Sequence, residues 1–122
     1  MLSRIRQIAV AVADLEKSKE FYGERLGLPK VLEVAGQLVF FDMAGIWLML
    51  SRPEEGFPPR PGSTLYFEVA DIHAAHEQLR ARGVEFVDEP HLIADMGSYE
   101  LWMSFFRDPD ETTLAIRAEV AK

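Results

Sequence analysis

The chain contains three histidines, side chains that can bind a metal ion or act as an acid or base. Their spacing limits which of these roles they can take. His73 and His76 lie three positions apart in a stretch with helical periodicity, so both imidazoles can lie on one helix face as metal ligands. A metal site needs more protein ligands than two, and no third ligand is evident for this pair. We therefore expect one of the two to be solvated and the other to lie at the edge of the core.

The third histidine lies in an irregular stretch, Pro90-His91-Leu92. Loops over a cleft often carry function, so His91 is open to two interpretations, a catalytic base and an ordinary loop histidine. The sequence favours the loop histidine, and we keep His91 as a candidate for ligand contact.

The composition argues against several classes of function. The 122 residues carry a formal net charge of -7, whereas phosphate binding needs a basic face. No apolar stretch reaches the length of a membrane span, and Met1-Leu2-Ser3-Arg4 lacks the architecture of a signal peptide. The absence of cysteine excludes disulfides and thiolate metal sites and fits a reducing compartment. We expect a cytoplasmic protein with no nucleic-acid or membrane partner.

A four-residue signature occurs twice, since Val12-Ala13-Asp14-Leu15 returns as Val69-Ala70-Asp71-Ile72. Each copy ends an apolar run and opens a helical stretch that its aspartate can cap. Further along each half, Phe40-Phe41 matches Phe105-Phe106. The chain is therefore predicted to be one unit written twice, with a cleft enclosed between the halves.

Each half is predicted to contain a strand, a helix and three strands. The first has strands at 7–12, 30–35, 37–42 and 46–51, with its helix between Asp14 and Gly27. The second has strands at 64–69, 84–87, 101–106 and 112–118, with its helix between Asp71 and Gly83 and an irregular stretch from 88 through Gly97. We expect a single domain over residues 1–122, with module 1 at about 1–51, a Pro- and Gly-rich linker at 52–62, and module 2 at about 63–122.

Three segments resemble the vicinal oxygen chelate superfamily, and they are VADLEKSKEFYGERLGL (12–28), VADIHAAHEQLRARGV (69–84) and FFRDPDETTLAI (105–116). This superfamily includes glyoxalase I, bleomycin-resistance proteins, extradiol dioxygenases and methylmalonyl-CoA epimerase. The resemblance implies an α+β fold of two βαβββ modules, whose eight strands form an incomplete barrel with helices outside (the glyoxalase/bleomycin resistance/dioxygenase fold), and it implies a homodimer. One departure is Glu111, where the family usually has glycine.

The resemblance also identifies four positions where metal-dependent members carry His, Gln or Glu ligands. Two lie seven residues before the capping aspartates, which gives Gln7 and Thr64 here, and two lie at the centres of the last strands, which gives Met49 and Ala115. Of these four side chains, at most Gln7 suits a hard or borderline divalent cation. We therefore expect no metal and no cofactor, and we expect Gln7 to be an amide that lines the pocket.

Strand alternation extends these positions into a pocket lining, because alternate side chains share a face. With Gln7 and Thr64 facing the cleft, the side chains predicted to join them are Ala9, Ala11, Trp47, Met49, Ser51, Tyr66, Glu68, Thr113, Ala115 and Arg117. Core filling is the other interpretation of Met49 and Ala115, and the facing of Trp102 is left undecided. The candidate ligand-binding residues are Gln7, Trp47, Met49, Thr64, Tyr66, Glu68, His91, Trp102 and Arg117, and no catalytic residue is assigned.

Such an aromatic, sulfur-containing lining suits a flat or partly apolar organic molecule. The leading hypothesis is therefore a metal-free protein, similar to the bleomycin-resistance branch, that binds a small, partly aromatic ligand in the cleft. The alternative is a metal-dependent enzyme, either a lyase, an epimerase or isomerase, or a dioxygenase, with an unconventional site drawn from Gln7, Glu68, His91 or Glu100. A third possibility is an accessory module that acts through its dimer surface.

Overall fold

The computed structural model describes residues 1–53 and 63–122. The chain forms two compact units, Met1–Gly62 and Ser63–Lys122, and each unit is described by itself. Most of the predicted linker, residues 54–62, lies outside the described residues. In the part of the chain that the structure describes, every helix is too short or too polar to cross a membrane.

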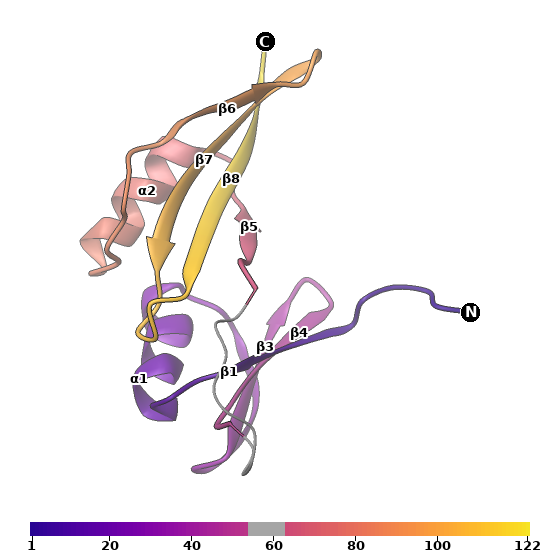
Figure 1. Cartoon of the computed structure of the whole chain (residues 1–122), viewed down its shortest axis with the longest axis vertical. Helices are drawn as coiled ribbons and strands as arrows, with labels where there is room; N and C mark the ends of the chain where they lie inside the picture. The colour runs from indigo at the N-terminus through magenta and orange to yellow at the C-terminus, as the bar shows by residue number, and fades with distance from the viewer. Residues whose placement is uncertain (54–62) are drawn as a thin grey trace. The chain divides into compact units, whose positions relative to one another are not determined.

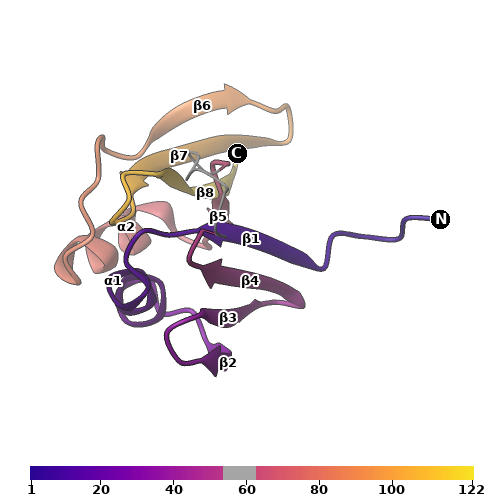
Figure 2. The same ribbon diagram turned by 60° about the horizontal axis from the view of Figure 1, so that its bottom comes forward.

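The first unit contains a four-stranded sheet with its helix on one face (Figure 1). Its elements are β1 (Gln7–Ala11), α1 (Leu15–Glu20), η1 (Phe21–Arg25), β2 (Lys30–Val34), β3 (Leu38–Met43) and β4 (Ile46–Ser51). The strand order across the sheet is β1-β4-β3-β2, which can be followed in Figure 2. β1 and β4 are parallel, and the other neighbours are antiparallel.

Helix α1 begins at the predicted cap. Asp14 has an extended backbone, and its Oδ1 accepts a hydrogen bond from the backbone N–H of Lys17 at 3.1 Å. The π-helical turn η1 continues α1, and Gly27, with φ of 78°, follows at the predicted end of the helical stretch. The helical segment therefore begins after Asp14 and ends before Gly27, the two positions that the sequence indicates.

The helical segment packs against one face of the first sheet. The buried side chains are Leu15, Phe21 and Tyr22 from the helical turns, and Val10, Val39, Phe41, Leu48 and Leu50 from the strands. Gly23 lies so close to the sheet that a Cβ at this position would be 3.2 Å from Cε1 of Phe41. The absence of a side chain at position 23 therefore permits the close approach of helix and sheet.

The second unit repeats this plan. Its elements are β5 (Tyr66–Glu68), α2 (Ile72–Ala81), β6 (His91–Asp95), β7 (Tyr99–Arg107) and β8 (Thr113–Ala121), in the sheet order β5-β8-β7-β6. β5 and β8 are parallel, as β1 and β4 are, and Oδ1 of Asp71 caps α2 by accepting from the N–H of Ala74 at 3.1 Å. The predicted repeat of one βαβββ module is confirmed.

The strand predicted at residues 84–87 is wrong. The sheet takes its fourth strand instead from the following stretch, which was expected to be irregular. Residues 84–87 form no strand, and Phe86 makes a single bridge to Phe106. The edge strand is instead β6, which pairs with β7. A bulge leaves Ile93 as an extra residue and breaks the alternation of side chains. Because that alternation is the sequence signal of a strand, β6 could not be predicted from it. His91 is therefore the first residue of a strand rather than part of a loop.

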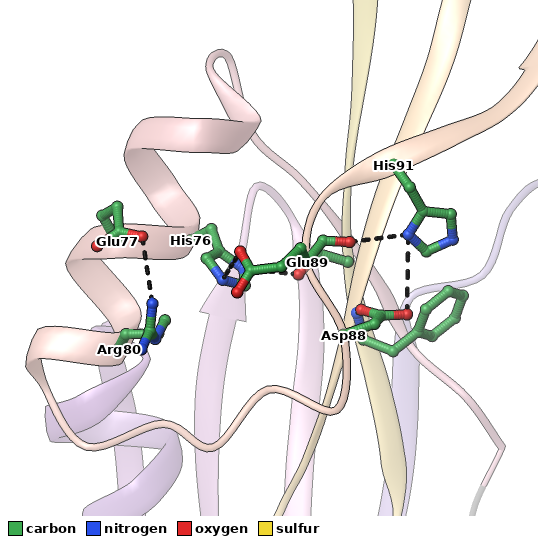
Figure 3. A network of polar contacts seen from close by, with 8 residues as sticks. His76, Glu77, Arg80, Asp88, Glu89 and His91 are labelled. Atoms are coloured by element: carbon green, nitrogen blue, oxygen red, sulfur yellow. Dashed lines mark hydrogen bonds and ion pairs between the residues drawn. The ribbon is translucent and has the colours of Figure 1, made fainter.

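Helix α2 buries one of its two histidines. His76 is 1% exposed, whereas His73 is exposed, so the expected pair of one solvated and one core histidine is confirmed. Nδ1 of His76 lies 2.8 Å from Oγ of Ser104, and its ring centroid lies 4.0 Å from that of Phe86. Nε2 faces a carboxylate oxygen of Glu89 at 3.3 Å (Figure 3). This histidine joins α2 to β7 through a buried polar contact.

The turn between β7 and β8 contains the unusual Glu111. Oδ1 of Asp108 accepts hydrogen bonds from the backbone N–H groups of Asp110 and Thr112, at 2.9 and 2.8 Å. In this closed turn Glu111 has φ of 63°, in the left-handed region. A residue with a Cβ costs roughly 1–2 kcal/mol in that region. The glutamate is therefore tolerated at the expense of stability.

We expect Glu111→Gly to raise the free energy of unfolding by about 0.5–1 kcal/mol, because relief of the left-handed strain exceeds the added freedom of glycine in the unfolded chain. Glu111→Ala keeps the Cβ and serves as the matched control, with a much smaller change expected. Urea denaturation of the three proteins measures the effect. Equal stability of the Gly and Ala variants would contradict this explanation.

An ion-pair network joins α1 to β2. The carboxylate of Glu33 contacts Nζ of Lys19 at 2.8 Å and Nζ of Lys30 at 2.9 Å. Hydrogen bonds from Lys19 and then Lys30 lower the pKa of Glu33 from 4.5 to about 2. The hydrogen bond that Lys19 donates to Glu33, followed by the one that it donates to Glu16, raises the pKa of Lys19.

Because the folded pKa of Glu33 lies below its ordinary value, the network stabilises the fold above about pH 4.5, and this stability is lost as the pH falls toward 2. We expect Glu33→Gln to lower stability at pH 6 and to match the native protein more closely at pH 2–3. Urea denaturation across this range measures the difference, and Glu24→Gln controls for the loss of a nearby negative charge. A difference that stays constant with pH would refute the linkage.

Candidate ligand-binding site

The face of each sheet that does not pack against that unit's own helix is called its open face. On the open face of the first sheet, the register places Gln7 beside Trp47, Ala9 beside Met49 and Ala11 beside Ser51. The side chains predicted from strand alternation to face together in module 1 therefore do so. The intervening residues Val10, Leu48 and Leu50 are buried.

Two contacts organise this open face. Nε2 of Gln7 donates toward Sδ of Met49 at 3.9 Å, a weak bond between an amide and a thioether. The rings of Phe40 and Trp47 lie 5.2 Å apart at an interplanar angle of 55°. The face is thus mainly apolar, with one amide group.

The four positions of the family's metal ligands do not carry a suitable donor set. In the first unit, Gln7 is paired with the soft thioether of Met49. In the second, Thr64 is exposed in the segment before β5, and Ala115 is a fully buried residue without a ligating group. Among the described residues, no three His, Asp or Glu side chains are grouped so as to hold a metal ion. A borderline divalent cation does not fit these side chains.

The open face of the second sheet carries a row of aromatic side chains across its strands. Tyr66 of β5, Ala115 of β8 and Phe105 of β7 are neighbours in register. The side chain of Tyr66 is 51% exposed, and its ring meets that of Phe105 edge to face, with centroids 6.3 Å apart. This edge-to-face arrangement and the exposure of Tyr66 leave aromatic surface for contact with a further ring.

The adjacent row is polar. It runs from Glu68 through Arg117 and Met103 to His91, one residue from each strand of the sheet. Nη2 of Arg117 lies 3.3 Å from a carboxylate oxygen of Glu119, and both side chains are partly exposed. The charges of Arg117 and Glu119 are thus paired and hydrated, which avoids the cost of an isolated buried charge.

A hollow of about 400 Å³ lies beside this polar row, lined by Glu68, Val69, Ala70 and Glu119. A second hollow of about 490 Å³ lies in the first unit, and its lining is Glu16, Lys19, Glu20, Gly23, Glu24, Lys30 and Phe41. The second is larger, but it lies at the helical side of its sheet and contains none of the predicted site residues. The hollow beside Glu68 is therefore the one that adjoins the candidate site.

His91 is held in place by the chain just before it. Its Nδ1 lies 2.8 Å from the carbonyl oxygen of Glu89 and 3.8 Å from Oδ2 of Asp88 (Figure 3). Oδ1 of Asp88 in turn accepts a hydrogen bond from the backbone N–H of Phe105 at 2.8 Å. The centroids of the His91 and Phe105 rings are 6.4 Å apart. The imidazole thus lies beside the aromatic row.

The structure separates one candidate residue from the others on this sheet. Trp102 is paired in register with Leu92 and Ala118, on the face that packs against α2. Its ring lies 5.7 Å from that of His73 of the helix, and its Nε1 donates to Oε1 of Glu100 at 3.2 Å. Trp102 and Glu100 therefore do not share the open face with Tyr66 and Arg117.

Sequence reasoning missed Phe40, Phe105 and Asp88. The two phenylalanines were available from the repeat, because in each Phe-Phe pair one ring must face the helix and the other the open face. Phe41 and Phe106 are the buried members, so Phe40 and Phe105 lie on the open faces. No comparable signal exists for Asp88, whose role depends on a contact with the backbone of a distant strand.

Comparison with known proteins identifies the family of this arrangement. The model of the "Glyoxalase/Bleomycin resistance protein/Dioxygenase superfamily" matches residues 4–116. The uncharacterized protein YraH of Bacillus subtilis (strain 168) is 30% identical over 127 residues, covering 93% of this chain and 96% of YraH.

Two solved structures show the same fold. Lactoylglutathione lyase from Agrobacterium tumefaciens superposes with a TM-score of 0.78 at 22% identity, over 97% of this chain and 95% of that one. A glyoxalase/bleomycin resistance protein/dioxygenase from Nocardioides gives a TM-score of 0.73 at 26% identity, over 98% and 87%. With two βαβββ units and a family match over nearly its whole length, this chain belongs to the glyoxalase/bleomycin resistance protein/dioxygenase superfamily.

Proposed function

We propose that this protein binds a small, partly aromatic organic molecule on the open face of the second sheet, without the metal ion used by metal-dependent members of its superfamily. The observation that carries the proposal is the half-exposed ring of Tyr66, set edge to face against Phe105 and next to a polar row. Exposed aromatic surface beside a few fixed polar groups is the usual composition of a small-molecule site.

The chemistry of the two rows supports a ligand rather than a simple core. Side chains that only fill a core have no need of an arginine, a glutamate and a histidine among them, because charged groups are costly to bury. Here Arg117 and His91 flank Met103 within one row and remain partly exposed. A flat ring placed over Phe105 and Met103 would gain apolar contact while its substituents reach polar groups at the edges.

The donor set supports the metal-free part of the proposal. Lactoylglutathione lyase from Agrobacterium tumefaciens shares the fold, but at 22% identity this likeness carries no activity to the present chain. The positions that correspond to the family's metal ligands hold Met49 and Ala115 on the last strands, and neither suits a borderline cation. A metal-dependent lyase, isomerase or dioxygenase would need a different set of ligands.

We also propose a homodimer located in the cytoplasm, as the sequence predicts. The exposed apolar side chains of Val31, Leu32 and Val34 on the edge strand β2 support self-association, because each leaves 40% or more of its surface uncovered. The small-molecule proposal does not depend on this assembly.

Replacing Tyr66 tests the binding face. We expect Tyr66→Ala to weaken an aromatic ligand found by NMR screening of small aromatic compounds by about tenfold, because the exposed ring supplies contact area and an edge-to-face partner. Leu92→Ala is the matched control, since Leu92 is 47% exposed on the same sheet but points to the opposite face. Titration calorimetry gives the affinities. Equal loss in both variants, or none in Tyr66→Ala, would rule out this face.

Metal analysis tests the other half of the proposal. Protein purified without chelators is expected to contain no stoichiometric transition metal, because the four corresponding side chains include at most one suitable donor. Addition of Ni²⁺, Zn²⁺, Mn²⁺ or Fe²⁺ should raise the midpoint of thermal unfolding of the native protein no more than it raises that of a Gln7→Ala control. One metal per chain, together with metal-dependent turnover, would replace the binding proposal with the enzyme alternative.

A further inference from the structure

We propose that His91 makes the binding face selective for phenols, by accepting a hydrogen bond at Nε2 from the hydroxyl group of an aromatic ligand. The inference rests on the proposed function, since it concerns the same face, and it adds the chemical class of the ligand. It follows from the contacts that fix the imidazole.

The first step is the tautomer of His91. Nδ1 lies 2.8 Å from the carbonyl oxygen of Glu89, and a carbonyl oxygen can only accept a hydrogen bond. Nδ1 therefore carries the proton in the neutral imidazole, and Nε2 presents a lone pair. Figure 3 shows that the second ring nitrogen points away from the segment that holds Nδ1. Among the described residues no hydrogen-bond partner is recorded for Nε2, so the acceptor is available to a ligand.

The second step is the rigidity of this arrangement. Oδ1 of Asp88 accepts a hydrogen bond from the backbone N–H of Phe105 at 2.8 Å. The backbone N–H of Val87 donates to the carbonyl oxygen of Phe105, also at 2.8 Å. These two bonds attach the segment before β6 to the strand that carries the aromatic row. The distance and orientation between Nε2 of His91 and the ring of Phe105 are thus fixed. A histidine in an unanchored loop would lack this fixed geometry.

The third step selects the donor. The rings of His91 and Phe105 are 6.4 Å apart at 35°, so an aromatic ligand beside Phe105 presents its edge toward the imidazole. A hydroxyl group on that edge lies in the plane of the ring and can point its hydrogen at Nε2. Oδ2 of Asp88 lies 3.8 Å from Nδ1, so a negative charge balances the positive charge that builds on the imidazole as it accepts. This favours an acidic hydroxyl, such as a phenol, over an alkyl alcohol.

A matched pair of ligands tests the inference, p-cresol and its methyl ether 4-methylanisole, which differ by the hydroxyl hydrogen and one methyl group. We expect the native protein to bind p-cresol about fivefold more tightly, the usual contribution of one hydrogen bond. NMR titration of ¹⁵N-labelled protein at pH 8 gives both affinities. The Nε2 resonance of His91 should shift with p-cresol and stay unchanged with the ether.

His91→Phe keeps an aromatic ring and removes the acceptor, so the two ligands should bind this variant with equal affinity. His73→Phe is the matched control, because it makes the same change at an exposed histidine of α2 and should preserve the fivefold preference. Equal affinities in the native protein, or a preference that survives in His91→Phe, would overturn the role of His91 while leaving ligand binding intact. If neither compound perturbs the amides of Tyr66 and Phe105, the proposed function itself fails.

Discussion

Each unit depends on the parallel pairing of its first strand with its last, β1 with β4 and β5 with β8. A tight turn cannot join parallel neighbours, so a helix and two further strands occupy the sequence between them. The helix then packs against one face of the sheet and gives that face an apolar lining. Side chains that could meet a ligand are confined to the other face, and alternation along each strand decides which ones they are.

Much of this arrangement could be predicted because its signals are local. The aspartate caps, the glycine stops and the repeated signature act within a few residues, and strand alternation correctly grouped Gln7 with Met49 and Tyr66 with Arg117. The position of His91 could not be predicted, because the bulge at Ile93 removes the alternation that would reveal β6. The facing of Trp102 was undecidable for a similar reason, since the strand around it has large side chains on both faces.

This protein has the fold of its family but not the side chains that bind metal in the metal-dependent members. The elements that make the fold are retained in both units, whereas the positions that hold metal ligands in other members hold an amide, a hydroxyl, a thioether and a methyl group. What remains on the second sheet is an edge-to-face aromatic pair, an ion-paired arginine and a histidine with a fixed tautomer. In the proposed function, these groups recognise a ligand by its shape and by hydrogen bonding.

The bulges have a consequence for how copies of the chain can meet. One edge strand of each sheet, β2 in the first and β6 in the second, carries an extra residue, Val31 and Ile93 respectively. A strand approaching β2 or β6 from another molecule would lose its hydrogen-bond register after a few residues, so neither sheet is easily extended through this edge. Contacts through these edges must therefore be made by side chains. Such contacts can form a limited, reversible association while the backbone resists growth into fibrils.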